Sequence, residues 1–243
     1  MDMPVTVEIA DEAEKQDVET VYDYFRYVDE TFSTFKKGSE ISKINQGKLK
    51  ISDSSQDMKE IFAKAEETKK LTLGYFDIRK DTGYDPSGIV KGWAILNAAK
   101  ILRKKGYRNF FIDAGGDIQI DGQSKNKNWS VGIRNPFNRF ENIKILSISN
   151  RGVATSGTYI RGQHIYNPFN KDLPIKEIVS LTVIGPDVYE ADRFATAAFA
   201  MGKKGIEFIE RLKDFEGYMV DKKGMATYTS GFSSYLCNNG ENN

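Results

Sequence analysis

Apolar residues recur every three or four positions in the first half of this chain, whereas in much of the second half they alternate with polar residues. The first spacing is typical of an amphipathic helix and the second of a half-buried strand. Asp11 can cap the first helix, and the polar segment 39–45 is interpreted as a loop with a short turn. After a strand over residues 5–9, the pattern predicts helices over about residues 18–32, 55–71 and 90–104.

The second half of the chain has the pattern of an antiparallel sheet. Two helices, over about residues 189–201 and 206–212, precede a late hairpin of 218–220 with 226–228. Helices early and hairpins later favour an α+β fold with an antiparallel β-sheet core and packed helices. No internal repeat or linker interrupts the pattern, so we expect a single domain over residues 1–243. The earlier strands are predicted at 110–113, 118–120, 129–133, 143–148 and 179–184, with Gly115–Gly116 as a tight turn after the first.

Composition narrows the class of protein more than it identifies a function. Hydrophobic residues make up 40% of the 243 positions, as in an ordinary globular protein. Lys and Arg number 35 against 34 Asp and Glu, which gives no sign of a nucleic-acid partner. No apolar run is long enough to span a membrane and no signal peptide is visible, so a complete chain is expected to be cytoplasmic. The single cysteine, Cys237, excludes an intramolecular disulfide.

The only histidine, His164, stands in a segment that has the character of a site. It follows the small hydroxyl-rich segment Thr155–Gly157, interpreted as a turn, and precedes Asn167–Pro168, which marks a loop or strand end. Histidine is the side chain whose ordinary pKa lies nearest neutral pH, so it is the default proton acceptor. A lone histidine is also often structural, and both readings stay open on this segment alone.

Two glycine-containing segments could hold a ligand. Gly115 and Gly116 between two strands would let a ligand approach the backbone closely, or they could form a plain turn. The segment from Asp85 to Gly92 opens a predicted helix with small residues, whose amide groups suit a phosphate, with Lys91 as an added charge. Its simpler reading is a helix cap with a solvated lysine. Neither segment matches a Rossmann or Walker A motif.

Asp192 and Thr196 lie four residues apart on a predicted helix and therefore share one face. A carboxylate and a hydroxyl are oxygen donors that suit Mg²⁺, and the alanines around them keep the face flat. The alternative is a buried alanine-rich helix without a metal.

Taken in order, these segments resemble the FAD:protein FMN transferases, the ApbE-like flavin transferases, over nearly the whole chain. Each motif is weak alone, but the ordered set is specific. The matching segments are Phe32–Phe35 with Ser39–Asn45, Thr72–Asp77, Asp85–Gly92, Asp113–Asp117, Ala154–Gly157 with His164–Ile165, and Ala191–Thr196.

The resemblance implies a Mg²⁺-dependent enzyme that binds FAD and moves its FMN half onto a Thr or Ser hydroxyl of an acceptor flavoprotein, releasing AMP. It implies that Asp192, Thr196 and the backbone carbonyl of Val90 hold the metal and that His164 accepts the hydroxyl proton. The residues implied to bind FAD are Phe76, Asp77, Asp85, Lys91, Gly115, Gly116, Asp117 and Thr155, with Phe35 as a stacking surface for one ring.

The chain departs from the family pattern in ways that keep other functions open. The family's long insertion before the Asp85 segment is reduced here to residues 78–84, and a family aspartate falls on Leu96. A flavin-binding or carrier module without transfer is one alternative. A second is a Mg²⁺-dependent FAD pyrophosphatase that uses water as the acceptor.

Overall fold

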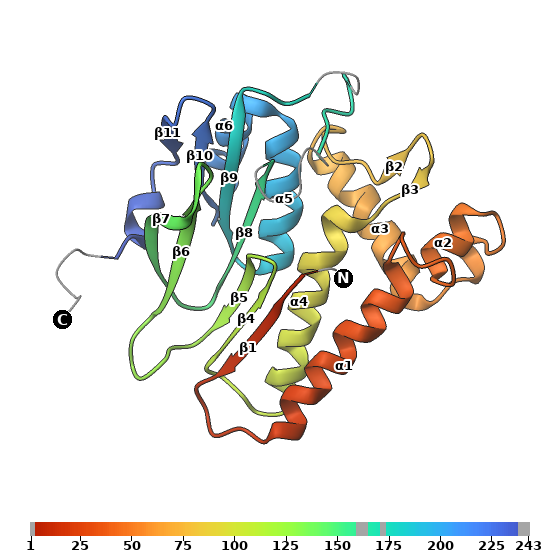
Figure 1. Ribbon diagram of the computed structural model, residues 1–243, viewed down its shortest axis with the longest axis horizontal. Coiled ribbons are helices and arrows are strands. Elements are labelled where there is room, and N and C mark those ends of the chain that lie inside the picture. The colour runs from red at the N-terminus through yellow and green to blue at the C-terminus, as the bar shows by residue number, and fades with distance from the viewer. Residues whose placement is uncertain (1–2, 159–164, 171–173, 238–243) are drawn as a thin grey trace.

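A seven-stranded antiparallel sheet runs through the computed structural model, which describes residues 3–158, 165–170 and 174–237. Both ends of the described chain contribute strands to this sheet, because β1 lies at one edge and β11 at the other (Figure 1). In spatial order the strands are β1 (Val5–Ile9), β4 (Phe110–Ala114), β5 (Asp117–Asp121), β8 (Arg151–Gly157), β9 (Ile178–Gly185), β10 (Glu216–Asp221) and β11 (Ala226–Tyr228).

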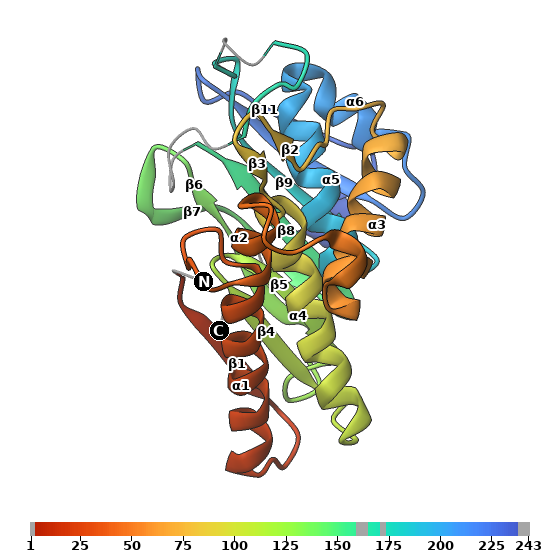
Figure 2. The ribbon, with the colours of Figure 1, turned by 90° about the vertical axis from the view of Figure 1, so that its right-hand side faces the viewer.

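Helices cover one face of the sheet in two tiers (Figure 2). The inner tier is α4 (Ser87–Lys104) and α5 (Val188–Ala200), which pack against the sheet and against each other. On the far side of α4 lie α1 (Lys15–Phe32) and α3 (Gln56–Leu71). The short segments are α2 (Glu40–Asn45), α6 (Gly205–Glu210), the 3₁₀ turns η1 (Ile51–Asp53) and η2 (Gly202–Lys204), and the small hairpin of β2 (Arg79–Lys80) and β3 (Gly83–Tyr84).

The opposite face of the sheet is covered by a separate hairpin, β6 (Trp129–Asn135) with β7 (Asn138–Ile148), and by the 3₁₀ turn η3 (Phe232–Tyr235). Neighbouring residues of one strand therefore enter different cores, as the strand period of two requires. On β8, Val153 packs with the β6–β7 layer whereas Ala154 packs with α5. The small Ala154 allows α5 to lie close to the sheet, and this closeness matters for the site below.

The helices, strands and antiparallel sheet expected from the sequence are present, and the α+β expectation is confirmed. Gly115 and Gly116 form the tight turn between β4 and β5, both with positive φ (64° and 93°). Two positive φ values in a two-residue hairpin loop are the signature of a type I′ turn, which glycine adopts without strain.

Two segment interpretations were wrong. Residues 39–45 are not a loop: Glu40–Asn45 form α2, whose Ser39 side chain caps the helix by accepting from Ser42 N at 3.2 Å. Thr155–Gly157 are not a turn but the end of β8, a central strand paired with β5 and β9. Their small side chains suit a strand that another element approaches closely.

The proposed capping role of Asp11 was also wrong. The cap of α1 is Glu14, and its side chain makes no capping hydrogen bond. Asp11 instead accepts hydrogen bonds from the backbone N–H groups of Arg108 and Asn109, at 2.7 and 2.9 Å, just before β4. It thus ties the β1–α1 connection to the start of the neighbouring strand.

None of the helices in the described ranges is both long enough and apolar enough to cross a membrane.

Candidate functional site

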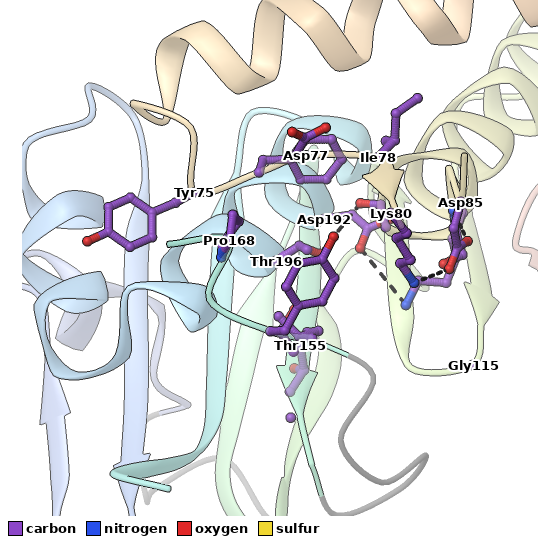
Figure 3. Close-up of a pocket in the computed structure, with 18 residues that line it drawn as sticks. Tyr75, Asp77, Ile78, Lys80, Asp85, Gly115, Thr155, Pro168, Asp192 and Thr196 are labelled. Carbon is purple, nitrogen blue, oxygen red and sulfur yellow. Dashed lines mark hydrogen bonds and ion pairs between the residues drawn. The ribbon is translucent and has the colours of Figure 1, made fainter. Parts of the chain in front are cut away.

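One pocket collects most of the residues singled out above. It lies where the end of β8, the first turns of α4, the middle of α5 and the β4–β5 turn meet (Figure 3). The loop after α3 and residues 165–168 complete its walls. The space, open mouth included, is about 980 Å³.

The close crossing of α4 and α5 brings the two helices' functional residues together. A Cβ on Gly92 would stand 2.7 Å from the Asp192 Cβ and 2.8 Å from the Val188 carbonyl oxygen, so only glycine fits there. The same approach lets the Gly92 N–H donate to Asp192 Oδ2 at 2.8 Å. The start of α5 is fixed by the Asp187 cap and by Gln119 Oε1, which accepts from Val188 N at 3.0 Å.

A buried charged cluster forms the floor of the pocket. The Lys91 ammonium lies 2.6 Å from Asp117 Oδ2 and 4.0 Å from Asp192 Oδ1. Asp117 is 1% exposed and Asp192 4% exposed. Thr155 N donates to the other Asp117 oxygen at 3.1 Å. Two buried carboxylates thus share one ammonium group.

The electrostatics of this cluster favour an additional cation. Burial raises the pKa of Asp192 far above the ordinary carboxylate range; Lys91 opposes that shift and the Asp117 carboxylate reinforces it. With both carboxylates ionised, the two acids and Lys91 carry a net charge of −1 in a region of low solvent access. A divalent cation beside Asp192 would change this net charge from −1 to +1, which suits an anionic ligand.

The donor chemistry around Asp192 fits Mg²⁺. The Gly92 N–H donates to Asp192 Oδ2, whereas Oδ1 lies 4.0 Å from the Lys91 ammonium, and Asp192 itself lines the pocket. Thr196 lies one helical turn further along α5 and lines the same pocket, with its hydroxyl 3.5 Å from the Gly88 carbonyl oxygen. Val90 lies in the first turns of α4, next to Lys91, with a buried side chain. Carboxylate, hydroxyl and carbonyl oxygens are the ligands of a hard cation.

Two aspartates of the pocket lining are held in ion pairs. Lys69 on α3 lies 2.7 Å from Asp77 Oδ2. Lys80 on β2 pairs with Asp85, which also accepts from Ser87 N at 3.1 Å. Burial acts to raise the pKa of Asp85, but the bonds from Lys80 and Ser87 outweigh it and hold that pKa below its usual range.

The pocket gathers eight of the residues that the sequence had pointed to, and four others lie outside its lining. Asp117 lies in the buried cluster below, Gly116 in the adjoining turn, and Val90 in the core. Phe35 does not line the pocket and is 96% exposed. The eight residues that line it are Phe76, Asp77, Asp85, Lys91, Gly115, Thr155, Asp192 and Thr196. His164 lies outside the described residues.

Lys91 has a different environment from the one expected. It is not the solvated lysine of the simpler reading, because its side chain is 16% exposed and bridges the two aspartates. Sequence reasoning had placed these three residues in three separate motifs.

Several pocket residues were not anticipated, among them Tyr75, Ser87, Tyr166 and above all Lys80. The sequence offered one signal for Lys80: it is a basic residue in segment 78–84, the short segment that precedes the Asp85 motif. Figure 3 shows Lys80 reaching Asp85 at one end of the pocket, with the Tyr75 ring at the other end.

The comparisons with known proteins find the ApbE family and proteins named as flavin transferases. The model of the ApbE family matches residues 1–81 and 79–219. A FAD:protein FMN transferase from Klebsiella pneumoniae is 26% identical over 166 residues, 64% of this chain and 46% of that protein. One from Escherichia coli K12 is 26% identical over 155 residues, 59% of this chain and 44% of that protein. The match thus spans about half the length of these curated relatives.

Solved structures share the fold over almost the whole chain. The flavin transferase ApbE from Vibrio cholerae superposes with a TM-score of 0.83 at 21% identity, covering 97% of this chain and 96% of that one. The ApbE protein from Thermotoga maritima gives a TM-score of 0.84, also at 21% identity and with the same coverage of both chains. At this identity the likeness establishes the architecture.

Proposed function

Since the chain belongs to the ApbE family, we propose that it is a Mg²⁺-dependent FAD:protein FMN transferase. The substrate is FAD, and the acceptor is a Ser or Thr hydroxyl of a flavoprotein. The hydroxyl oxygen forms a bond to the FMN phosphorus, and the bond from that phosphorus to the bridging oxygen breaks. AMP leaves with the bridging oxygen, and the hydroxyl proton passes to a base.

The observation that carries this proposal is the buried group of Asp117, Lys91 and Asp192 beside Thr196. Burying two carboxylates with a single ammonium group costs free energy, so this group does not serve to stabilise the fold. The same group suits a cation that meets a pyrophosphate. We assign Asp192, Thr196 and the Val90 carbonyl as the metal ligands.

Bound Mg²⁺ would neutralise the pyrophosphate and stabilise charge on the departing AMP. Lys91 holds Asp117 in place and lies 4.0 Å from Asp192 Oδ1. Phe76 is 3% exposed, packs near Gly88 and closes the wall behind the ligand. Asp77, Asp85, Gly115, Gly116 and Thr155 complete the proposed FAD contacts, and Phe35, exposed outside the pocket lining, is retained only as the stacking surface that the resemblance implies.

His164 is the proposed base that accepts the hydroxyl proton, on the strength of its sequence position. His164→Ala is expected to abolish transfer while FAD affinity stays within about twofold, because a base acts on the acceptor and not on FAD binding. If FAD affinity and transfer fell together, the residue would instead belong to the binding site.

The test is intact-mass spectrometry of a small acceptor protein that carries a Ser/Thr flavinylation motif, incubated with this protein, FAD and Mg²⁺. A gain of one FMN mass on the acceptor, with an equal amount of AMP, is the expected result. FMN and AMP with an unmodified acceptor would indicate a pyrophosphatase. FAD that is bound but stays intact would indicate a carrier module.

A further inference from the structure

The hairpin of β2 and β3 separates the pocket from a second cleft. That cleft lies against α2 and is lined by polar residues that include Thr34, Ser42 and Asn45. Of the described residues, Lys80 and Asp85 are the ones that line both spaces. Their ion pair therefore stands at the boundary between the two.

The hairpin backbone does not need this ion pair to keep its place. Asn45 Nδ2 donates to the Tyr84 carbonyl at 2.9 Å, and Tyr84 N donates back to Asn45 Oδ1 at 2.8 Å. Asp85 N donates to the Ile78 carbonyl at 2.8 Å across the base of the hairpin. Lys80 itself is a third exposed, so its long side chain can change partner while the backbone stays fixed.

The charges of the pocket favour such a change when an anion binds. Its described lining carries three carboxylates, on Asp77, Asp85 and Asp192, and two ammonium groups, on Lys80 and Lys91. Lys91 is held in the buried cluster by Asp117. Lys80 is thus the pocket cation that can turn toward a ligand.

We propose that Lys80 binds the pyrophosphate of the dinucleotide substrate by exchanging the Asp85 carboxylate for a phosphate oxygen. The inference rests on the proposed function and adds a residue to it. The exchange leaves Asp85 supported, since its carboxylate keeps the Ser87 N–H and lies at the N-terminus of α4, where a negative charge is favoured.

The experiment is a titration of FAD in the presence of Mg²⁺, followed by flavin fluorescence, with the full chain and its Lys80→Gln variant. A charge-assisted contact to phosphate predicts that the variant binds FAD about tenfold to a hundredfold more weakly. The KM for FAD should rise by a similar factor while kcat changes less. Equal affinity of variant and wild type would overturn the inference.

Lys69→Gln is the matched control. It removes one positive charge and one ion pair to a pocket aspartate, Asp77, but Lys69 does not line the pocket. Its FAD affinity is expected to stay within about threefold of the wild type. If both variants lost affinity equally, general charge would explain the result and Lys80 would have no special contact.

A second comparison separates phosphate binding from mere neutralisation of Asp85. In an Asp85→Asn background, the added Lys80→Gln change should still weaken FAD binding by about tenfold. If Lys80 served only to neutralise Asp85, Lys80→Gln would weaken FAD binding in the wild-type background but not in the Asp85→Asn background. A wild-type protein that binds no FAD would overturn the proposed function itself, and the inference with it.

Discussion

Replacement of Asp192 by Asn is expected to stabilise the metal-free protein while it destroys activity. The carboxylate is buried with Asp117 as its neighbour, and one ammonium group serves both. The amide is nearly the same shape, and its oxygen can keep the hydrogen bond from Gly92 N. Its NH₂ group can donate toward Asp117 Oδ2, whose partner in the structure is the Lys91 ammonium.

The size of the effect follows from the charge of the cluster. Because burial raises the pKa of Asp192 to about 8, folding near neutral pH must either bind a proton at this carboxylate or keep it charged beside Asp117, and the amide avoids both costs. Removing an incompletely compensated buried charge is worth about 1–3 kcal/mol in the free energy of unfolding. For a domain of this length, that corresponds to a rise of roughly 3–9 °C in Tm.

The assay is thermal unfolding in EDTA and again in Mg²⁺, beside AMP release from FAD. Mg²⁺ at a hundred times its Kd should add about 2.7 kcal/mol to the free energy of unfolding of the wild type and so raise its Tm. The Tm of Asp192→Asn should hardly respond to Mg²⁺. A variant that melts below the wild type in EDTA would refute the argument about buried charge. A variant that Mg²⁺ stabilises as fully as the wild type would refute the assignment of Asp192 as a ligand.

Three further substitutions test the packing and the outer wall. Gly92→Ala should lower activity at least tenfold and the free energy of unfolding by about 1–2 kcal/mol, because its Cβ would displace Asp192. Gly38→Ala is the control for both measurements, because a Cβ there would lie in open space. Gly152→Ala should leave little folded protein by circular dichroism, because its Cβ would lie 2.0 Å from Val188 N, and native yield would contradict the close α5–β8 approach. Asp85→Asn should cost about 0.5–1 kcal/mol at pH 7. The pKa of Asp85 in the folded protein lies below the ordinary 3.8, so its contribution to stability is present above pH 3.8 and is lost as the pH falls through the folded pKa. Urea titrations should therefore show a smaller difference in free energy of unfolding between wild type and Asp85→Asn at about pH 2.5 than at pH 7.

Most of the secondary structure could be predicted from the sequence because the helices and strands bury one clear face. The α1 stripe and the alternation in β6 follow the simple periods of 3.6 and two. α2 was missed because six residues with two buried isoleucines give too short a pattern. Ser39, which caps α2, was the available signal for it.

The end of β8 was missed for a different reason. Thr155–Gly157 have the composition of a turn, but the strand lies between β5 and β9 and α5 packs against it. Small residues are needed there because a neighbouring element approaches closely, as the contacts of Gly152 with Asp187 and Val188 show. Composition alone does not distinguish this requirement from that of a turn.

The candidate site was predictable as a set of residues but not as an arrangement. Helical spacing places Asp192 and Thr196 on one face, and that placement agrees with the shared pocket. Nothing in the local pattern indicates that Lys91 bridges Asp117 and Asp192, because this contact depends on how α4 crosses α5. The resemblance indicated which residues belong to the site, and only the structure shows which of them contact one another.

The same crossing explains why stability and function oppose each other in this site. Gly92 allows the helices to approach, and the approach buries Asp192 where its charge is costly. A wider crossing would hydrate the carboxylate and relieve that cost, but it would also lose the Gly92 N–H that orients it and the low solvent access that strengthens its hold on a cation. The unfavourable burial of Asp192 is therefore the physical property that suits it to the proposed role of binding a metal ion at the floor of the pocket.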